Sequence, residues 1–341
     1  MRLKVASLIG ATLLFAGCMG DISKIVPEVF KTSAGKSASS YTIKHGKQVY
    51  NVTRDGVTFS DGSYITPEGE GNLILPRGYY YVSSYGGRIL IADKSGNMQV
   101  LKSDGNPLSE TKLKAPLVTG VAYDKGVAYL LQGNRIGLYD PFKNKVYYEK
   151  ELSGGTAIDN RLASPIVTAN FILVPTLDGN LVLITLNTAS VPKVIPVSGY
   201  KNNGNVIFAK TIGDKIIVAS ANTIQSLSPS GKKVYNTNVA DIIINNGYIY
   251  LLTRNGNIVQ LTLDLQETGH RKFSYADFAT IAVRGGKIYA FAKSGSLVVL
   301  SADMQKYKVY SVGEARNYSY VSGNWLYIDD KKVNLDMLNY E

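Results

Sequence analysis

The chain has 341 residues, of which 45% are hydrophobic and 18% charged, so it carries enough apolar side chains for a large core and is not a disordered protein. Its formal net charge is +11, from 37 basic and 26 acidic residues. A single cysteine excludes a disulfide within the chain, and two histidines are available for acid–base or metal chemistry.

The first eighteen residues have the pattern of a bacterial lipoprotein signal peptide. A basic segment, residues 1–4, precedes an apolar segment, residues 5–17, that is too short to span a bilayer as a permanent helix. Its end resembles the lipobox, in which small residues stand directly before a cysteine, although Phe15 replaces the usual leucine. The resemblance implies cleavage after residue 17 and acylation of Cys18, and several acyl chains anchor a protein stably. The alternative is an ordinary signal peptide with an incidental cysteine.

The residues after the cysteine indicate the membrane and a spacer. Met19 stands in place of the aspartate that is associated with inner-membrane retention, which by resemblance favours the outer membrane, facing the periplasm. Residues 31–40 are small, polar and turn-prone, and predict a flexible tether that spans about 15–20 Å on average. We therefore expect a signal peptide at 1–17, a lipidated cysteine and tether at 18–40, and a folded body at 41–341.

A repeat of about forty residues runs through the folded body. Four segments place a small polar residue, a glycine, and Asn or Ser ahead of an apolar strand: 93–104, 176–187, 253–264 and 292–303. Weaker copies lie at 131–142, 220–231 and 328–339. A short strand rich in β-branched and aromatic residues precedes each turn, a pattern that does not suit a helical repeat. Four short strands in about forty residues predict an all-β fold, a β-propeller.

Seven copies of the repeat are visible, so we expect about seven four-stranded blades. Eight is the alternative if residues 41–80 build most of a separate blade. The last repeat, from Trp325 onward, ends soon after its third strand. Because a propeller has to close its ring, we expect an N-terminal strand to complete that blade. Polar-alternating segments at 145–152 and 305–312 are typical of outer strands at exposed blade edges.

The repeat unit pairs a Gly-led aliphatic and tyrosine strand with a Ser/Asp/Asn-Gly turn and a leucine-containing strand. Over most of residues 80–335 it resembles the repeat of quinoprotein-like propellers, the PQQ-like repeat. That family includes quinone-dependent alcohol dehydrogenases and non-enzymatic lipoproteins, among them a scaffold of the outer-membrane barrel-assembly machinery. This chain lacks the cysteine pair that covers the quinone and has one tryptophan, Trp325, where those enzymes carry one in most repeats. The resemblance therefore implies a scaffold without the quinone cofactor.

The sequence identifies no catalytic residue, no cofactor-binding residue and no metal site. His45 lies near the first expected strand, and His270 lies in a segment that is typical of an exposed outer turn. Two histidines this far apart, without clustered carboxylates or thiolates, predict structural or surface roles. A catalytic site assembled from separate blades stays open as an alternative.

The polar turn at 253–257 resembles a binding loop when it is considered alone. The same turn recurs in the other copies of the repeat, at 93–104, 176–187 and 292–303. The repeated Gly indicates a tight hairpin turn, in which Asn255 and Gly256 tolerate positive φ. Arg254 is what distinguishes this turn, since the sibling turns have Lys or Leu there. If this loop binds a ligand, we expect Arg254 to take part.

Charge provides the remaining evidence on partners. Loss of Arg2 and Lys4 with the signal peptide would leave a net charge of +9. Basic residues gather mostly at expected turns, as in 231–233, 270–272 and 330–332, where solvated loops are the ordinary interpretation. The same loops could contact acidic proteins, anionic lipid or wall polymers, whereas nucleic acid is not expected in this compartment.

We therefore expect a non-catalytic scaffold, anchored in the outer membrane, whose partners are envelope proteins. Outer-membrane protein assembly is one candidate assembly, by resemblance alone. A scaffold of a secretion or motility machine, or a surface adhesin, is one alternative. Another is a periplasmic hydrolase or lyase that acts on polysaccharide through a central-channel site, which predicts carboxylates or histidines with perturbed pKa values converging at one mouth of the ring.

Overall fold

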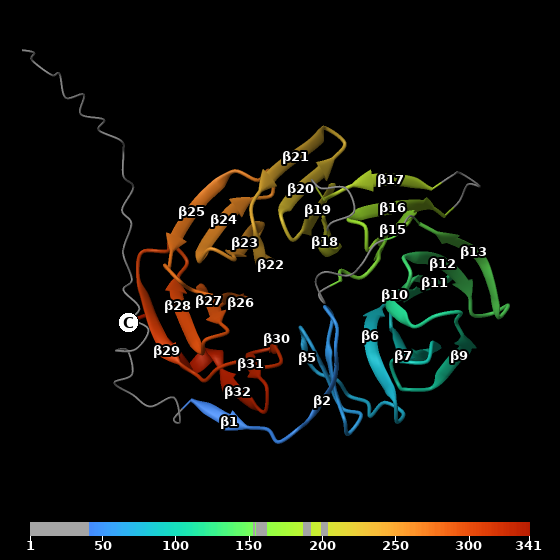
Figure 1. Ribbon diagram of the computed structural model, residues 1–341, viewed down its shortest axis with the longest axis horizontal. Helices are drawn as coiled ribbons and strands as arrows, with labels where there is room; N and C mark the ends of the chain where they lie inside the picture. Colours follow the sequence, from blue (N-terminus) through green and yellow to red (C-terminus); the bar gives the residue numbers. More distant parts are fainter. Residues whose placement is uncertain (1–40, 153, 155–161, 187–191, 199–203) are drawn as a thin grey trace, which may run out of the picture.

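The computed structural model describes residues 41–152, 154, 162–186, 192–198 and 204–341. These residues form eight antiparallel sheets of four strands each, arranged in a ring (Figure 1). The predicted all-β propeller is confirmed. Among the described residues, no helix is long and apolar enough to cross a membrane.

The first four blades follow one another along the chain. Blade I consists of β2 (Val49–Val52), β3 (Val57–Phe59), β4 (Tyr64–Thr66) and β5 (Gly69–Glu70). Blade II consists of β6 (Tyr79–Tyr85), β7 (Arg88–Asp93), β8 (Asn97–Lys102) and β9 (Pro107–Lys112). Blade III consists of β10 (Leu117–Tyr123), β11 (Gly126–Leu131), β12 (Arg135–Asp140) and β13 (Lys145–Glu151). Blade IV consists of β14 (Ile166–Val167), β15 (Phe171–Pro175), β16 (Asn180–Thr185) and β17 (Lys193–Pro196).

The remaining blades complete the circle. Blade V consists of β18 (Val206–Ile212), β19 (Lys215–Ser220), β20 (Thr223–Ser228) and β21 (Gly231–Asn236). Blade VI consists of β22 (Val239–Asn245), β23 (Tyr248–Thr253), β24 (Asn257–Thr262) and β25 (Glu267–Lys272). Blade VII consists of β26 (Phe278–Arg284), β27 (Lys287–Ala292), β28 (Ser296–Ser301) and β29 (Tyr307–Ser311). Blade VIII combines β30 (Ser319–Ser322), β31 (Trp325–Ile328) and β32 (Lys331–Asn334) with β1 (Thr42–Lys44).

The ring has eight blades, the alternative, rather than the seven that the visible repeats favour. The reason is that residues 49–70 form blade I by themselves. The strands of this blade are only two to four residues long, so their alternation is too short to stand out in the sequence. Its middle turn nevertheless follows the repeat, since Gly62 has a positive φ of 83° and donates its N–H to the carbonyl of Phe59.

The ring is closed by an N-terminal strand, as predicted. β1 pairs antiparallel with β32, with Ile43 opposite Lys332. The backbone N–H of His45 extends the ladder by donating to the carbonyl of Asp330 at 2.9 Å. Figure 1 shows the blue strand β1 beside the red strand β32, at the outer edge of blade VIII.

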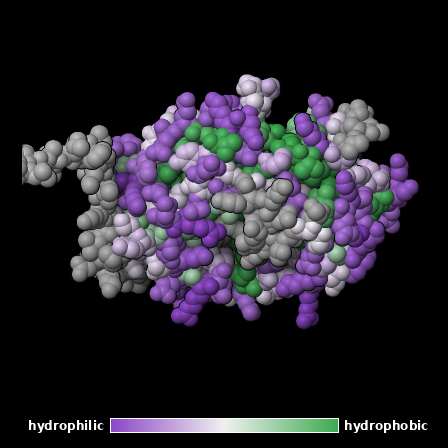
Figure 2. Space-filling view, turned by 45° about the horizontal axis from the view of Figure 1, so that its top comes forward, coloured by the Kyte–Doolittle hydropathy of each residue, from purple (hydrophilic) through white to green (hydrophobic). Residues whose placement is uncertain are grey.

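Burial separates the middle strands from the outer strands. All six residues of β11 and of β28 are buried, because neighbouring blades cover both faces, and each fully buried aliphatic side chain stabilises the fold by about 1.5–3 kcal/mol. In the outer strands β13 and β29 most residues are exposed or only partly buried, as predicted for exposed blade edges. The surface seen in Figure 2 is mostly hydrophilic, with hydrophobic residues in separate patches.

The glycine turns of the repeat fasten each blade to the next one. Four of these glycines have φ values between 81° and 96°, and the carbonyl of each accepts an N–H from the connection to the following blade: Gly96, Gly179, Gly256 and Gly295. A Cβ on Gly256 would lie 2.1 Å from the carbonyl oxygen of Phe273, so this position requires glycine for space as well as for φ. The hairpin interpretation is confirmed with one correction. Asn255 does not adopt positive φ, because Gly256 alone supplies the reversal.

Asp329 joins the closing strand to the rest of blade VIII. Its carboxylate accepts the backbone N–H groups of Arg316 at 2.7 Å, Asn317 at 2.9 Å and Tyr318 at 3.2 Å. Its carbonyl oxygen accepts the Tyr318 hydroxyl and lies 2.9 Å from Nε2 of His45. Burial acts to raise the pKa of Asp329, but the three N–H donors hold this pKa below its usual value.

Asp329→Ala should lower the free energy of unfolding by about 2 kcal/mol near neutral pH, because three N–H groups lose their acceptor. A carboxyl group whose pKa is lower in the folded state stabilises the protein above its unfolded pKa, 3.8, and this contribution is lost as the pH falls through the folded pKa. Urea titrations at a series of pH values should therefore show a variant that is less sensitive to acid than the wild type. An identical acid response of the two proteins would contradict this role.

Candidate functional site

The centre of the ring is occupied by a hairpin from blade I. Residues 53–56, between β2 and β3, form this channel hairpin, and its Arg54 reaches across the ring. The Arg54 guanidinium donates to the carboxylate of Asp241 at 2.8 Å and to the carbonyl of Ile242 at 2.7 Å. It also stacks over the ring of Phe208, 5.5 Å from its centroid. One side chain therefore ties blade I to blades V and VI on the opposite side of the ring.

The next residue of the channel hairpin, Asp55, turns to blade IV. Its carboxylate accepts a hydrogen bond from the Ser164 hydroxyl. Burial raises the pKa of Asp55, and the Ser164 hydrogen bond and the Arg54 charge only partly oppose this. A cavity of about 120 Å³ remains beside the hairpin, with Thr119 and Ser164 in its wall. Asp55 and Asp241 thus each place a carboxylate beside the channel hairpin, and each carboxylate is hydrogen-bonded within the protein to a different blade.

A more open pocket, of about 450 Å³, lies on blade VI. It is lined by seven residues from the β23–β24 turn and from the segment that leads out of β25: Arg254, Asn255, Lys272, Ser274, Tyr275, Ala276 and Asp277. The pocket exists because the Gly256 carbonyl accepts the Phe273 N–H at 2.8 Å, which brings this segment against the turn. Two cationic side chains face one carboxylate, so the pocket is positively charged. Arg254, which the sequence comparison singles out, lies in its wall.

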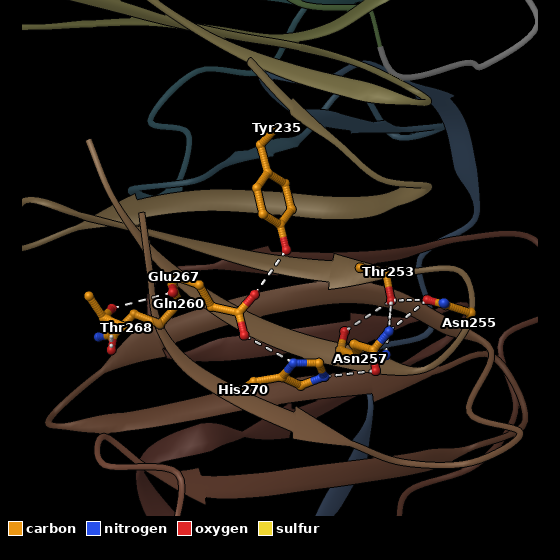
Figure 3. Close-up of polar contacts among 8 residues, drawn as sticks. All are labelled: Tyr235, Thr253, Asn255, Asn257, Gln260, Glu267, Thr268 and His270. Atoms are coloured by element: carbon orange, nitrogen blue, oxygen red, sulfur yellow. Dashed lines mark hydrogen bonds and ion pairs between the residues drawn. The ribbon is translucent and has the colours of Figure 1, made fainter. Parts of the chain in front are cut away.

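A chain of polar contacts leads from this pocket across the outer strands of blade VI. Nδ1 of His270 lies 3.1 Å from a Glu267 carboxylate oxygen, and Nε2 lies 3.0 Å from the side-chain oxygen of Asn257. The Tyr235 hydroxyl of blade V donates to the other Glu267 oxygen at 3.1 Å. The Asn257 amide donates to the side-chain oxygen of Asn255 at 2.8 Å. Figure 3 shows the imidazole held between Glu267 and Asn257.

A β-bulge makes the contact between Glu267 and His270. Residues three apart in a regular strand point to opposite faces of the sheet. Here the register of β24 against β25 shifts at Gln260, which leaves Thr268 outside the ladder and puts Glu267 on the face of His270. His270 therefore lies in a strand, which corrects the predicted outer turn. The sequence does carry a signal for the bulge, since Gly269 stands inside the strand directly after Thr268, but sequence reasoning did not use it.

The predicted residues fall in separate places. Cys18 lies outside the described residues. His45 belongs to blade VIII, where it packs edge-on against Phe59 and Tyr327 with ring centroids 5.5 Å apart, and burial lowers its pKa. His270 belongs to blade VI, so the two histidines are not brought together. No three His, Cys, Asp or Glu side chains of the described part of the chain are grouped to hold a metal ion.

The basic segments also need a correction, since they lie in strands rather than mostly at turns. Residues 231–233 begin β21, 270–272 end β25, and 331–332 begin β32. Lysines are accommodated there because the outer strands β21 and β25 have one face in water. The positive charge is therefore distributed along the rim of the ring.

The fold and the sites together define a class of protein. The channel hairpin crosses the ring and is bonded to its far side, and the turns, the outer strands and the blade VI pocket are further surfaces for contact. These features are consistent with a protein-binding scaffold.

Comparisons with known proteins point the same way. No family model matches the chain. Part of it is 26% identical to the plasminogen-binding protein PgbB of Helicobacter pylori, over 193 residues in one strain and 184 in another. The first match covers 54% of this chain and 36% of the relative, so the chain spans about a third of the length of these curated relatives.

Solved structures establish the likeness of the fold. BamB from Moraxella catarrhalis has a TM-score of 0.62 at 13% identity, with 85% of this chain and 97% of BamB covered. The C-terminal WD40 domain of Sif2 has a TM-score of 0.60 at 11% identity, with 86% and 97% covered. At such identities the likeness shows the fold alone.

Proposed function

We propose that the chain is a non-catalytic lipoprotein, anchored in a bacterial outer membrane through Cys18 and facing the periplasm, that serves as a scaffold for an envelope protein assembly. The observation that carries the proposal is the closed ring with its own hairpin in the channel, which presents a preorganised outer surface at little conformational cost on binding. The lipobox-like N-terminus supplies the anchor, and residues 31–40 the tether. Outer-membrane protein assembly is the assembly that the resemblance to BamB supports.

Cys18→Ser should move most of the protein from the membrane fraction to the soluble periplasmic fraction, because a serine does not receive the lipid that the cysteine thiol accepts. The measurement is cell fractionation followed by immunoblotting. Phe15→Leu is the matched control, since it restores the usual lipobox residue and should keep the protein at the membrane. An unchanged distribution of the serine variant would contradict the lipoprotein proposal.

The assembly is tested by crosslinking in intact cells and identification of the captured proteins. Barrel-assembly components among them support the proposal as stated. Components of a secretion or motility machine would keep the scaffold and change the assembly that it serves. Recovery of a glycan substrate alone would favour the enzyme hypothesis and overturn the scaffold.

A second candidate function rests on the curated relative. PgbB is named for plasminogen binding, and its 26% identity to this chain over 193 residues supports the proposal of an adhesin that is exposed on the cell surface and binds plasminogen. The test measures binding of plasminogen to the purified protein and, in parallel, cleavage of the protein by protease added to intact cells. If the purified protein does not bind plasminogen and protease does not cleave it on intact cells, the adhesin proposal is wrong and the periplasmic scaffold is retained.

A further inference from the structure

Two polar side chains of the blade VI pocket, Asn255 and Asp277, form hydrogen bonds within the protein. The side-chain oxygen of Asn255 contacts the Thr253 hydroxyl and the Asn257 amide. One carboxylate oxygen of Asp277 accepts both the backbone N–H and the hydroxyl of Ser294, at 3.3 Å and 2.9 Å. A neutral sugar would need such donors and acceptors for its hydroxyl groups. The Asn255 oxygen and one Asp277 oxygen are therefore less available to a neutral ligand.

Positive charge is what the pocket offers instead. Arg254 and Lys272 stand in its wall, and the Lys272 ammonium has no ion pair with a carboxylate of the described residues. A guanidinium binds a carboxylate through two parallel hydrogen bonds, and an ammonium adds a point charge. The pocket is thus suited to a carboxylate ligand.

Tyr275 adds an aromatic surface in an unfavourable backbone conformation. Its side chain is 87% exposed, and its φ of 64° lies in the left-handed region, which a bulky residue adopts at a cost in free energy. Burial does not offset this cost, because the ring faces solvent. Strained residues of this kind gather at binding sites, and tyrosine and arginine are enriched among the anchors of protein interfaces.

We propose that the blade VI pocket binds an acidic peptide segment of the scaffold's protein partner. A carboxylate of the segment lies between Arg254 and Lys272, and an apolar side chain next to it packs on Tyr275. The inference rests on the proposed scaffold function and names the place at which the partner is held. The net charge of +9 that remains after loss of Arg2 and Lys4 (35 basic against 26 acidic residues) favours a partner of opposite sign.

The test uses the purified full-length protein in detergent and a fluorescent hexapeptide in which aspartate and phenylalanine alternate. Fluorescence anisotropy should show saturable binding that weakens as salt is added, and binding should be lost when asparagine replaces aspartate. Arg254→Ala and Lys272→Ala should each raise the Kd about tenfold, which corresponds to the loss of about 1.4 kcal/mol from a contact with the peptide carboxylate. Lys94→Ala, the same turn position in blade II, should leave the Kd unchanged.

Three results would overturn the proposal. The first is wild-type affinity in the Lys272 and Arg254 variants. The second is equal binding of the asparagine peptide. The third is failure of the acidic peptide to bind, whether or not inorganic phosphate or phosphatidylglycerol vesicles bind in its place, since these would indicate a phosphate or membrane ligand.

Tyr275→Gly separates binding from folding. Glycine adopts positive φ freely, so the variant should have an unchanged or higher Tm and yet bind the peptide about tenfold more weakly. A purely structural tyrosine would give the opposite result, with a lower Tm at unchanged affinity. That outcome would remove Tyr275 from the proposed site.

A photo-crosslinking residue placed at position 275 tests the pocket in cells. The matched position is Tyr85, an exposed tyrosine at the end of β6 in blade II. Partner crosslinks from position 275 support the pocket. Crosslinks from position 85 alone would keep the scaffold and overturn the pocket. Crosslinks from neither position also overturn the pocket, and the whole-cell crosslinking above then decides on the scaffold.

Discussion

Arg54→Met should lower the free energy of unfolding by about 3–5 kcal/mol, because it leaves the Asp241 carboxylate in the centre of the ring without its guanidinium. The side chains are 21% and 11% exposed and lie 2.8 Å apart, so water replaces the lost contact poorly. The same change removes the hydrogen bond to Ile242 and the stacking on Phe208. Urea unfolding followed by tyrosine fluorescence measures the effect.

Two further variants show whether the buried charge is the cause. Lys47→Met breaks an ion pair with Asp61 whose members are 40% and 53% exposed and 3.7 Å apart, and it should cost less than about 1 kcal/mol. Arg54→Met combined with Asp241→Asn removes both charges and keeps an oxygen for the Ile281 N–H, so it should recover most of the lost stability. If Arg54→Met had the same free energy of unfolding as Lys47→Met, the contacts of the channel hairpin across the ring would not stabilise the fold.

The propeller could be predicted because its signals are local and repeated. Gly256 and the equivalent glycines of the other repeats recur because the backbone requires them. Their φ is positive, and the segment that leads to the following blade lies too close to leave room for a side chain. The closing strand could be inferred because the repeat from Trp325 lacks a fourth strand. Blade I escaped the count because its strands, of two to four residues, are too short for a visible alternation.

The sites could be predicted only in part. Arg254 was found because it departs from its siblings at a fixed position of the repeat. Nothing local distinguishes the channel hairpin from another turn, and Arg54 meets a carboxylate 187 residues away that only ring closure brings near. The strain at Tyr275 is a backbone property without a residue signature, whereas the only local signal for the bulge at Thr268 is the neighbouring Gly269. Ion pairs between residues far apart in the chain, and irregular backbone within a turn or strand, are therefore the features that could not be predicted from this sequence.

Ile43→Pro should lower the free energy of unfolding by about 3 kcal/mol, because it breaks the ladder that closes the ring. Since the His45 N–H donates to the Asp330 carbonyl, the alternation of an antiparallel ladder makes Ile43 and Lys332 the next hydrogen-bonded pair. Proline at position 43 removes this donor, whereas the Ile43 side chain itself is 52% exposed and contributes little by burial. Urea unfolding measures the loss.

Lys44→Pro is the matched control, because the same alternation turns its N–H away from β32, and it should cost less than about 1 kcal/mol. If both proline variants were equally stable, closure would depend on the C-terminal segment instead. There Leu338 is fully buried, and the Tyr310 hydroxyl donates to the Asn339 carbonyl at 2.6 Å. Leu338→Ala would then be the more damaging change, at about 2–4 kcal/mol. A selective effect at Ile43 would instead show that the strand directly following the proposed membrane tether closes the ring, so that the tether leads straight into the closing strand.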